Sequence, residues 1–181
     1  MIKQRIILAS LILLFSKTII ASIYIERIVE DDFANVKEDV ILAIKGQGLV
    51  IAHHSDVSTM LRRTTTNLAQ QAFNIANNIV NIMTPINVIN TDKPAQTTYK
   101  HGVVIEFCSA DLSAQTTAAD PNNILFCPFS VAIFQLSNEP NQVHVSYLRL
   151  SQFADAKNAK SVEALTKVEA MLAEIVSEAL D

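Results

Sequence analysis

The chain carries two hydrophobic patterns, one that repeats at every second residue and one that repeats at every third or fourth. The shorter period occurs in five runs rich in β-branched and aromatic residues, which is typical of strands. The five runs are 22–30, 49–57, 100–108, 129–136 and 143–150. Between the last two runs, the segment Ser-Asn-Glu-Pro-Asn-Gln predicts a hairpin connection, because turn-forming residues fill it.

The longer period predicts helices, because apolar residues three or four positions apart share one face of a helix. The predicted helices lie at 31–48, 58–83, 109–121 and 160–180. Asp31 or Asp32 can cap the first of them, and Gly46 or Gly48 can end it. Ser109 caps the third. In the last helix the apolar face consists of Val162, Leu165, Val168, Leu172, Ile175 and Leu180.

The second helix is the longest of the four, and Pro85 ends it because proline cannot continue a helix. Thr64 to Thr66 are poor helix formers and can divide it into two pieces. We expect its amides to face solvent and its apolar positions to face the interior of the domain. These apolar positions are Leu61, Leu68, Ala72, Phe73, Ala76, Val80 and Met83.

The order of the elements is strand, helix, strand, helix, several strands and a final helix. This order predicts the α+β class, with a mainly antiparallel sheet and helices packed on one face of it.

The N-terminal segment, residues 1–21, predicts a secretory signal peptide. Cations precede a short apolar run at 6–15, and Ala21 offers a small residue for cleavage. The run is shorter than the roughly 20 apolar residues of a spanning helix. Cleavage would leave a single domain, 22–181, in the periplasm or outside the cell and without a stable membrane span. The alternative is an uncleaved anchor formed by residues 6–23.

The charge balance argues against nucleic acid as a partner. The formal net charge is −4, and cleavage removes Lys3, Arg5 and Lys17 but no acid, which changes −4 to −7. Proteins that bind nucleic acids neutralise phosphates with Lys and Arg, so this domain is not expected to bind them. Apolar residues make up 50% of the chain, which is enough to build one core.

Four segments of the chain resemble the secreted branch of the domain-of-unknown-function family 302. They read HSDVSTMLRRTTTNL, YKHGVVIEFCSADL, AADPNNILFCPFSVAIFQL and EPNQVHVSYLR. In that branch a Met-Leu-x-Arg-Thr segment, a Tyr-Lys-His strand start, a Phe-Cys-Ser turn and an Ala-Asp-Pro...Phe-Cys-Pro segment recur. The resemblance covers the chain from about Ile23 to Leu150, and about 68–98 looks like a helical insertion. It implies a β-α-β-sheet-α domain similar to the TATA-box-binding-protein-like fold, with no established activity.

The two cysteines stand at the end of one predicted strand and the start of the next. If those strands are antiparallel neighbours, the sulfurs of Cys108 and Cys127 can meet, whereas parallel strands would prevent a bond. In an oxidising compartment two cysteines in a small domain are usually paired. A bridge would stabilise the fold by about 3 kcal/mol on the chain-entropy model. We expect a structural disulfide; two buried free thiols and a redox pair are the alternatives.

His101 offers another interpretation, in which it binds a soft metal or haem iron together with Cys108 and Cys127. Seven residues separate His101 from Cys108, so a regular strand places them on opposite faces and about 23 Å apart. This separation does not suit a shared ion. We therefore expect no metal and no cofactor.

Glu106 shares a strand face with Cys108 and could act as a general acid or base if it were buried. Arg63, in the Met-Leu-x-Arg-Thr segment, is its candidate partner, and we expect a buried Arg63–Glu106 ion pair. The sequence has no Gly-rich phosphate loop, nucleophile elbow, zinc-finger spacing or Ser-His-Asp arrangement.

Two classes of function remain open. The first is a non-catalytic module that binds a small ligand or a protein in an apolar pocket between helices and a curved sheet. The alternative is a thiol-, metal- or haem-dependent redox protein centred on Cys108 and Cys127. The first predicts an unreactive cystine, and the second predicts a labile bridge or a bound metal. Because no catalytic arrangement is apparent, the first is preferred and an enzyme is not expected.

Overall fold

The computed structural model describes residues 22–83 and 98–181. The signal peptide expected at residues 1–21 lies outside this part of the chain, and so do Pro85 and most of the second half of the expected insertion. No helix in the described ranges is long and apolar enough to cross a membrane.

Five antiparallel strands form one sheet, which confirms the predicted α+β class. The strands are β1 (Tyr24–Val29), β2 (Val50–Asp56), β3 (Tyr99–Cys108), β4 (Phe129–Leu136) and β5 (Val143–Leu148). Their order across the sheet is β1-β5-β4-β3-β2, and every neighbouring pair is antiparallel. The predicted hairpin joins β4 to β5. The two strands that come first in the sequence therefore form the two edges.

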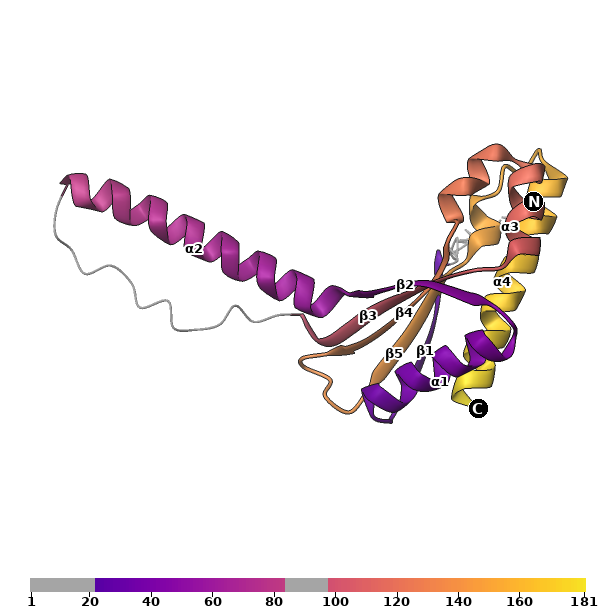
Figure 1. Cartoon of the computed structure of the whole chain (residues 1–181), viewed down its shortest axis with the longest axis horizontal. Coiled ribbons are helices and arrows are strands. Elements are labelled where there is room, and N and C mark those ends of the chain that lie inside the picture. Colours follow the sequence, from indigo (N-terminus) through magenta and orange to yellow (C-terminus); the bar gives the residue numbers. More distant parts are fainter. Residues whose placement is uncertain (1–21, 84–97) are drawn as a thin grey trace, which may run out of the picture.

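Two helices cover one face of the sheet: α1 (Phe33–Gly46) and α4 (Ala159–Leu180) (Figure 1). Alternate residues of the strands point at them, since a strand directs successive side chains to opposite faces. The resulting core includes the fully buried Ile105, Phe107, Val131, Ile133, Val143 and Val145 from the sheet and Val40, Ile44, Leu165, Val168, Leu172 and Ile175 from the helices. The apolar face predicted for the last helix thus supplies much of this core.

The helix ends follow the local chemistry of the sequence. α1 ends at Gly46, and Gly48 adopts a positive φ of 73°, a conformation that glycine accepts without strain. Ser109 caps α3 (Ala110–Ala119) by accepting a hydrogen bond from the Leu112 backbone N–H. Two short 3-10 helices, η1 (Pro121–Phe126) and η2 (Leu150–Phe153), were not predicted.

A buried polar network ties η1 to α3 and α4. The Asn123 amide nitrogen donates to the Thr116 carbonyl oxygen at 3.0 Å and to the Ser161 hydroxyl at 3.0 Å. The Ser161 hydroxyl in turn lies 3.4 Å from the Asn123 amide oxygen. Asn158, the N-cap of α4, donates to the Ala119 carbonyl oxygen at 2.9 Å. These bonds fix the corner of the domain in which α3 packs on α4.

The longest helix, α2 (Val57–Met83), departs from the prediction in its surroundings (Figure 1). It begins directly after β2 and extends away from the sheet, so that only its first part lies against β3. Leu61 and Leu68, expected in the interior, are 41% and 65% exposed, and Ala72 is exposed as well. The expected burial is wrong at these positions because no described element packs along this length of the helix. We call α2 the arm.

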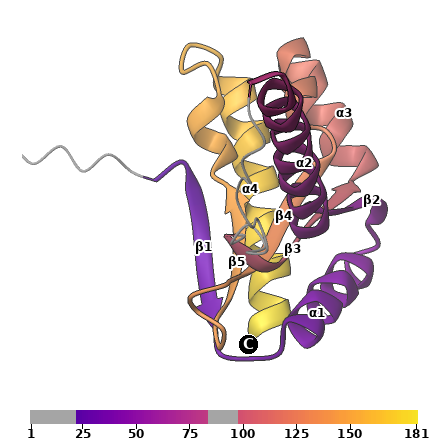
Figure 2. The ribbon, with the colours of Figure 1, turned by 90° about the vertical axis from the view of Figure 1, so that its left-hand side faces the viewer.

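The arm is a single continuous helix, although Thr64 to Thr66 could have divided it. The three threonine hydroxyls donate to backbone carbonyl oxygens four residues earlier, so each bonds within the helix rather than competing with it. Asp56 caps the arm, because its carboxylate accepts from the Thr59 backbone N–H and the Ser58 hydroxyl, both at 2.8 Å. In Figure 2 the arm points toward the viewer.

Candidate functional site

Cys108 and Cys127 lie side by side where β3 ends and β4 begins. β3 and β4 are antiparallel, with Phe107 opposite Phe129, which is the arrangement that brings the two cysteines together. They are 4.5 Å apart and both are free thiols, so the structure contains no disulfide between them. The proximity was correctly anticipated, but the bond itself is not formed.

The surroundings of the two thiols are partly buried. Burial raises the pKa of Cys108, and the neighbouring Cys127 raises it further. The hydroxyl of Ser113, on α3, lies 3.2 Å from the Cys127 sulfur. A raised pKa keeps Cys108 protonated at neutral pH, whereas reactive cysteines are thiolates.

His101 does not join the cysteines. It lies near the opposite end of β3, is exposed, and stacks on Phe33 of α1 with ring centroids 5.0 Å apart. Within residues 22–83 and 98–181, no three His, Cys, Asp or Glu side chains gather closely enough to hold a metal ion. The three proposed ligands therefore do not form one site.

The expected Arg63–Glu106 ion pair is not present either. Arg63 is exposed on the arm, and Glu106 is half-buried on β3. The salt bridges between described residues do not include one that joins these two side chains. The arm carries Arg63 along the outside of the domain, which is why the prediction of a buried pair fails.

The sheet face opposite α1 and α4 has no described helix packed along it, and we call it the open face. Cross-strand partners form rows on it, and one row consists of Ile28, His144, Phe134 and Gly102. A second row consists of Glu26, Ser146, Ala132 and Val104.

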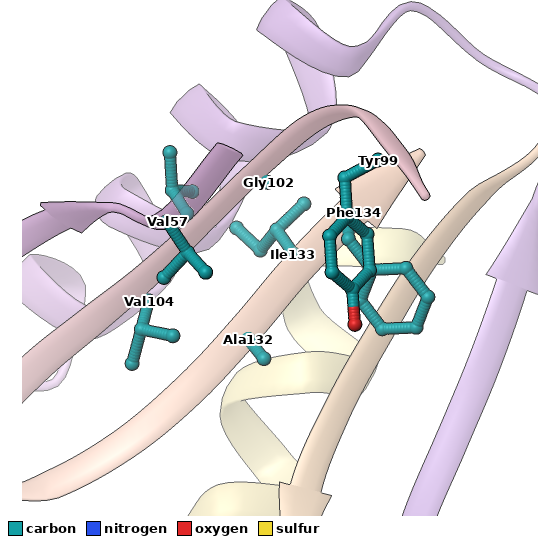
Figure 3. Close-up of a pocket in the computed structure, with 8 residues that line it drawn as sticks. Val57, Tyr99, Gly102, Val104, Ala132, Ile133 and Phe134 are labelled. Carbon is teal, nitrogen blue, oxygen red and sulfur yellow. The ribbon is translucent and has the colours of Figure 1, made fainter. Parts of the chain in front are cut away.

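A small apolar pocket opens between β3, β4 and the first turn of the arm (Figure 3). Its volume is about 130 Å³. Tyr99 and Phe134 form one end, with their rings in an edge-to-face contact at 5.5 Å, and Val57 and Val104 form the other. Gly102 has no side chain, so the space between the two ends stays open. Every side chain that lines the pocket is apolar or aromatic, so its chemistry favours an apolar group.

His144 forms a polar centre beside this pocket. Its ring stacks on Phe134 with centroids 4.7 Å apart and an interplanar angle of 7°. Its Nδ1 lies 3.1 Å from Glu26 Oε1, and its Nε2 lies 3.2 Å from Glu139 Oε2. His144 is only 5% exposed, while both carboxylates reach solvent. Both ring nitrogens therefore lie within hydrogen-bonding distance of a carboxylate oxygen.

Sequence reasoning expected an apolar pocket between helices and the sheet but did not identify the residues that line it, and it missed the His144 centre. His144 stands between Val143 and Val145 in a predicted strand, so alternation alone places it on the face opposite the core. The sequence therefore indicated which face of the sheet His144 occupies. It did not indicate the partners of His144, because Glu26 comes from an edge strand 118 residues away in the sequence.

The comparisons with known proteins agree with this fold. The chain is similar to a solved structure described as "uncharacterized conserved protein DUF302 from Bacillus stearothermophilus". The TM-score is 0.60 at 13% sequence identity, and the match covers 87% of this chain and 98% of the other. At this identity the likeness shows the fold alone. No curated protein matches the sequence.

The family itself is shown by the sequence. The "Domain of unknown function DUF302" matches residues 62–179, which is more than half of the chain. The match extends beyond Leu150, where the resemblance was expected to end. The chain therefore belongs to the DUF302 family.

Proposed function

We propose that this chain is a non-catalytic binding module and that it binds through the open face, where one apolar group of a small ligand or a protein enters the pocket. The observation that carries this proposal is the apolar pocket between Tyr99, Phe134 and Val57. Its volume of about 130 Å³ is close to that of cavities of roughly 150 Å³ that bind benzene. The pocket therefore suits a single ring or one branched aliphatic side chain.

The neighbouring His144 centre supports binding to a pocket whose wall is ordered before the ligand arrives. Glu26 and Glu139 hold the His144 ring against Phe134, so the pocket wall is stacked and fixed before anything binds. Binding to a wall that is already ordered loses less entropy than binding to a flexible one.

The proposal is tested by titrating toluene and indole into the protein and following NMR chemical shifts of the open face. Ala132→Leu fills the pocket from β4, and we expect it to weaken binding at least tenfold. Ala114→Leu adds the same atoms at an exposed site on α3 and should leave binding unchanged. The proposal fails if the wild-type chain binds neither compound, or if Ala132→Leu binds them as well as the wild type does.

A second candidate function is a dithiol that forms a reversible disulfide, and the 4.5 Å approach of Cys108 and Cys127 favours it. Oxidation by a second disulfide would join the two sulfurs, and the two protons and two electrons that Cys108 and Cys127 lose would convert the oxidant to a dithiol. The signal peptide expected at 1–21 and the resemblance to a secreted branch support a periplasmic or secreted location, where such oxidants operate.

The intact mass of the protein from its native compartment, measured after thiol alkylation with and without reductant, tests this candidate. A mass beginning at Ser22 with two thiols blocked until strong reductant is added would indicate a structural bridge and contradict this candidate. Thiols that alkylate at once, or after mild reductant alone, would support it.

A further inference from the structure

The arm presents a regular apolar stripe to solvent. Leu61, Leu68 and Ile75 recur every seven residues, which places them on one side of a helix. Their exposed fractions are 41%, 65% and 61%. Apolar residues at this spacing are typical of a helix face that packs against another surface, and we call these three residues the stripe.

The open face is a second apolar surface that no described element covers. Besides the pocket, it carries large apolar side chains that are at least 40% exposed at its edges. They are Tyr24, Ile28, Val50 and Leu148. Exposed apolar side chains gathered on one face usually mark a site of interaction.

The stripe and the open face do not meet within the chain. The arm starts where the edge strand β2 ends and runs outward in one continuous helix (Figures 1 and 2). A helix of 27 residues is about 40 Å long, and nothing in it turns back toward the sheet. Residues 22–83 and 98–181 therefore supply no partner for either surface.

The charges of the two surfaces are opposite. The arm contains two ionisable side chains and no acid; Arg62 lies beside the stripe, whereas Arg63 lies on the other side of the helix. The open face contains the carboxylates of Glu26 and Glu106, and Glu139 lies beside it. The two histidines of this face, His53 and His144, are flanked by Glu106 and by the two other glutamates respectively. Arg62 beside the stripe and carboxylates on the open face favour the contact of these two surfaces.

The dimensions also agree. Five strands about 4.8 Å apart make a sheet roughly 20 Å wide. The 15 residues from Leu61 to Ile75 span about 21 Å of helix. A strip of this length and about 10 Å wide, buried on both arms and both open faces of a symmetric pair, amounts to about 840 Å². This size is typical of a weak, concentration-dependent association.

We propose that the partner is a second copy of this chain, and that the arm of each copy lies across the open face of the other with an apolar side chain of the stripe in the pocket. This inference rests on the proposed binding function of the open face and names its occupant. In the pair, each copy gives one arm and receives one, so the contact is the same on both sides of a twofold axis.

The first test is the molar mass of the protein from light scattering over a range of concentrations. We expect the wild-type chain to form a dimer. Leu68→Asp places a charge in the stripe and should raise the dissociation constant at least tenfold, with the helix content unchanged. Gln70→Asp adds the same charge on the opposite side of the arm and should leave the dimer intact. A monomeric wild type, or a dimer that Leu68→Asp does not weaken, overturns the inference.

The second test identifies which surface the arm contacts. Arg63→Glu, on the side of the arm away from the stripe, is the control and should leave the dimer intact. One variant carries Arg62→Glu, and the other carries Glu26→Lys and Glu106→Lys. Each alone should dimerise at least tenfold more weakly, and an equimolar mixture should recover a mixed dimer because one arm then matches the other open face. In an alternative dimer the two arms would contact each other, and the open-face variant would then dimerise as well as the wild type. That result would also overturn the inference.

Toluene binding separates failure of this inference from failure of the proposed function. If the arm occupies the pocket, Leu68→Asp should bind toluene more tightly than the wild-type dimer does, because its pocket is vacant. If Leu68→Asp changes neither the mass nor toluene binding while Ala132→Leu still weakens toluene binding at least tenfold, the inference fails and the proposed function stands. If Ala132→Leu has no effect on toluene binding, the proposed function fails.

Discussion

Replacing His144 by phenylalanine tests whether the polar centre of the open face stabilises the fold. Phenylalanine keeps a ring that can stack on Phe134 and removes the two contacts with Glu26 and Glu139. The comparison thus isolates the polar contacts from the stacking.

The expected loss of stability depends on how far the two partners of His144, Glu26 and Glu139, are exposed to solvent. A hydrogen bond to a charged group contributes about 1.5–3 kcal/mol when it is buried, and an exposed ion pair contributes about 0.2–1 kcal/mol. Glu26 and Glu139 are 31% and 38% exposed, so water can replace the imidazole and each contact lies between these limits. We expect His144→Phe to lower the free energy of unfolding by about 1–2 kcal/mol in total. For a domain of this size that corresponds to a fall in Tm of roughly 2–8 °C.

Urea denaturation at neutral pH measures this loss, and a double-mutant cycle with Glu139→Gln isolates one contact. The control is Glu163→Gln in the exposed Glu163–Lys167 pair of α4, for which no measurable change is expected. If His144→Phe unfolds at the same urea concentration as the wild type, or if the cycle gives no coupling, the two contacts do not stabilise the fold and the reasoning is refuted.

Three further predictions follow from other contacts. Ser161→Ala should lower the free energy of unfolding by about 1–3 kcal/mol, because it leaves the buried Asn123 amide oxygen without the Ser161 hydroxyl; urea denaturation measures this, and an unchanged midpoint would contradict it. The Thr59 backbone N–H and the Ser58 hydroxyl lower the pKa of Asp56, so its stabilisation of the arm should be complete above about pH 4 and be lost as pH falls through the lowered value. Circular dichroism of the wild type against Asp56→Ala would show this, and equal helix loss in both chains on acidification would refute it. Burial raises the pKa of Cys108, so in a Cys127→Ser chain iodoacetamide should alkylate Cys108 more slowly when the protein is folded than when it is unfolded in urea at the same pH; equal rates would exclude the effect.

The sequence predicted the sheet because its signals are local. Alternation in residues 129–136 and 143–150, with turn residues between them, is enough to define a hairpin. The closeness of Cys108 and Cys127 followed from the same reasoning, since antiparallel neighbours bring the end of one strand beside the start of the next. Strand geometry could not decide between a disulfide and the alternative of two free thiols, because the redox state of two adjacent cysteines is not encoded in it.

The arm shows where the pattern misleads. Leu61 and Leu68 have the spacing of a buried face, and periodicity identifies which side of a helix is apolar but not what covers that side. The predicted Arg63–Glu106 pair failed for the same reason. The contact of His144 with Glu26 depends on which strands are neighbours, and the pairing of the first strand with the last is a long-range choice.

The strand order constrains when the protein can fold during its synthesis. β1 pairs with β5, so an N-terminal strand completed at Val29 finds its neighbour only after Leu148 has been made. β2 waits in a similar way for β3. The chain is made from its N-terminus, so β2 can pair with β3 once Cys108 has been made, and β4 and β5 can then add in turn. The sheet can therefore grow from the β2 edge toward the β1 edge, and for most of synthesis β1 is an exposed strand that could pair with other polypeptides.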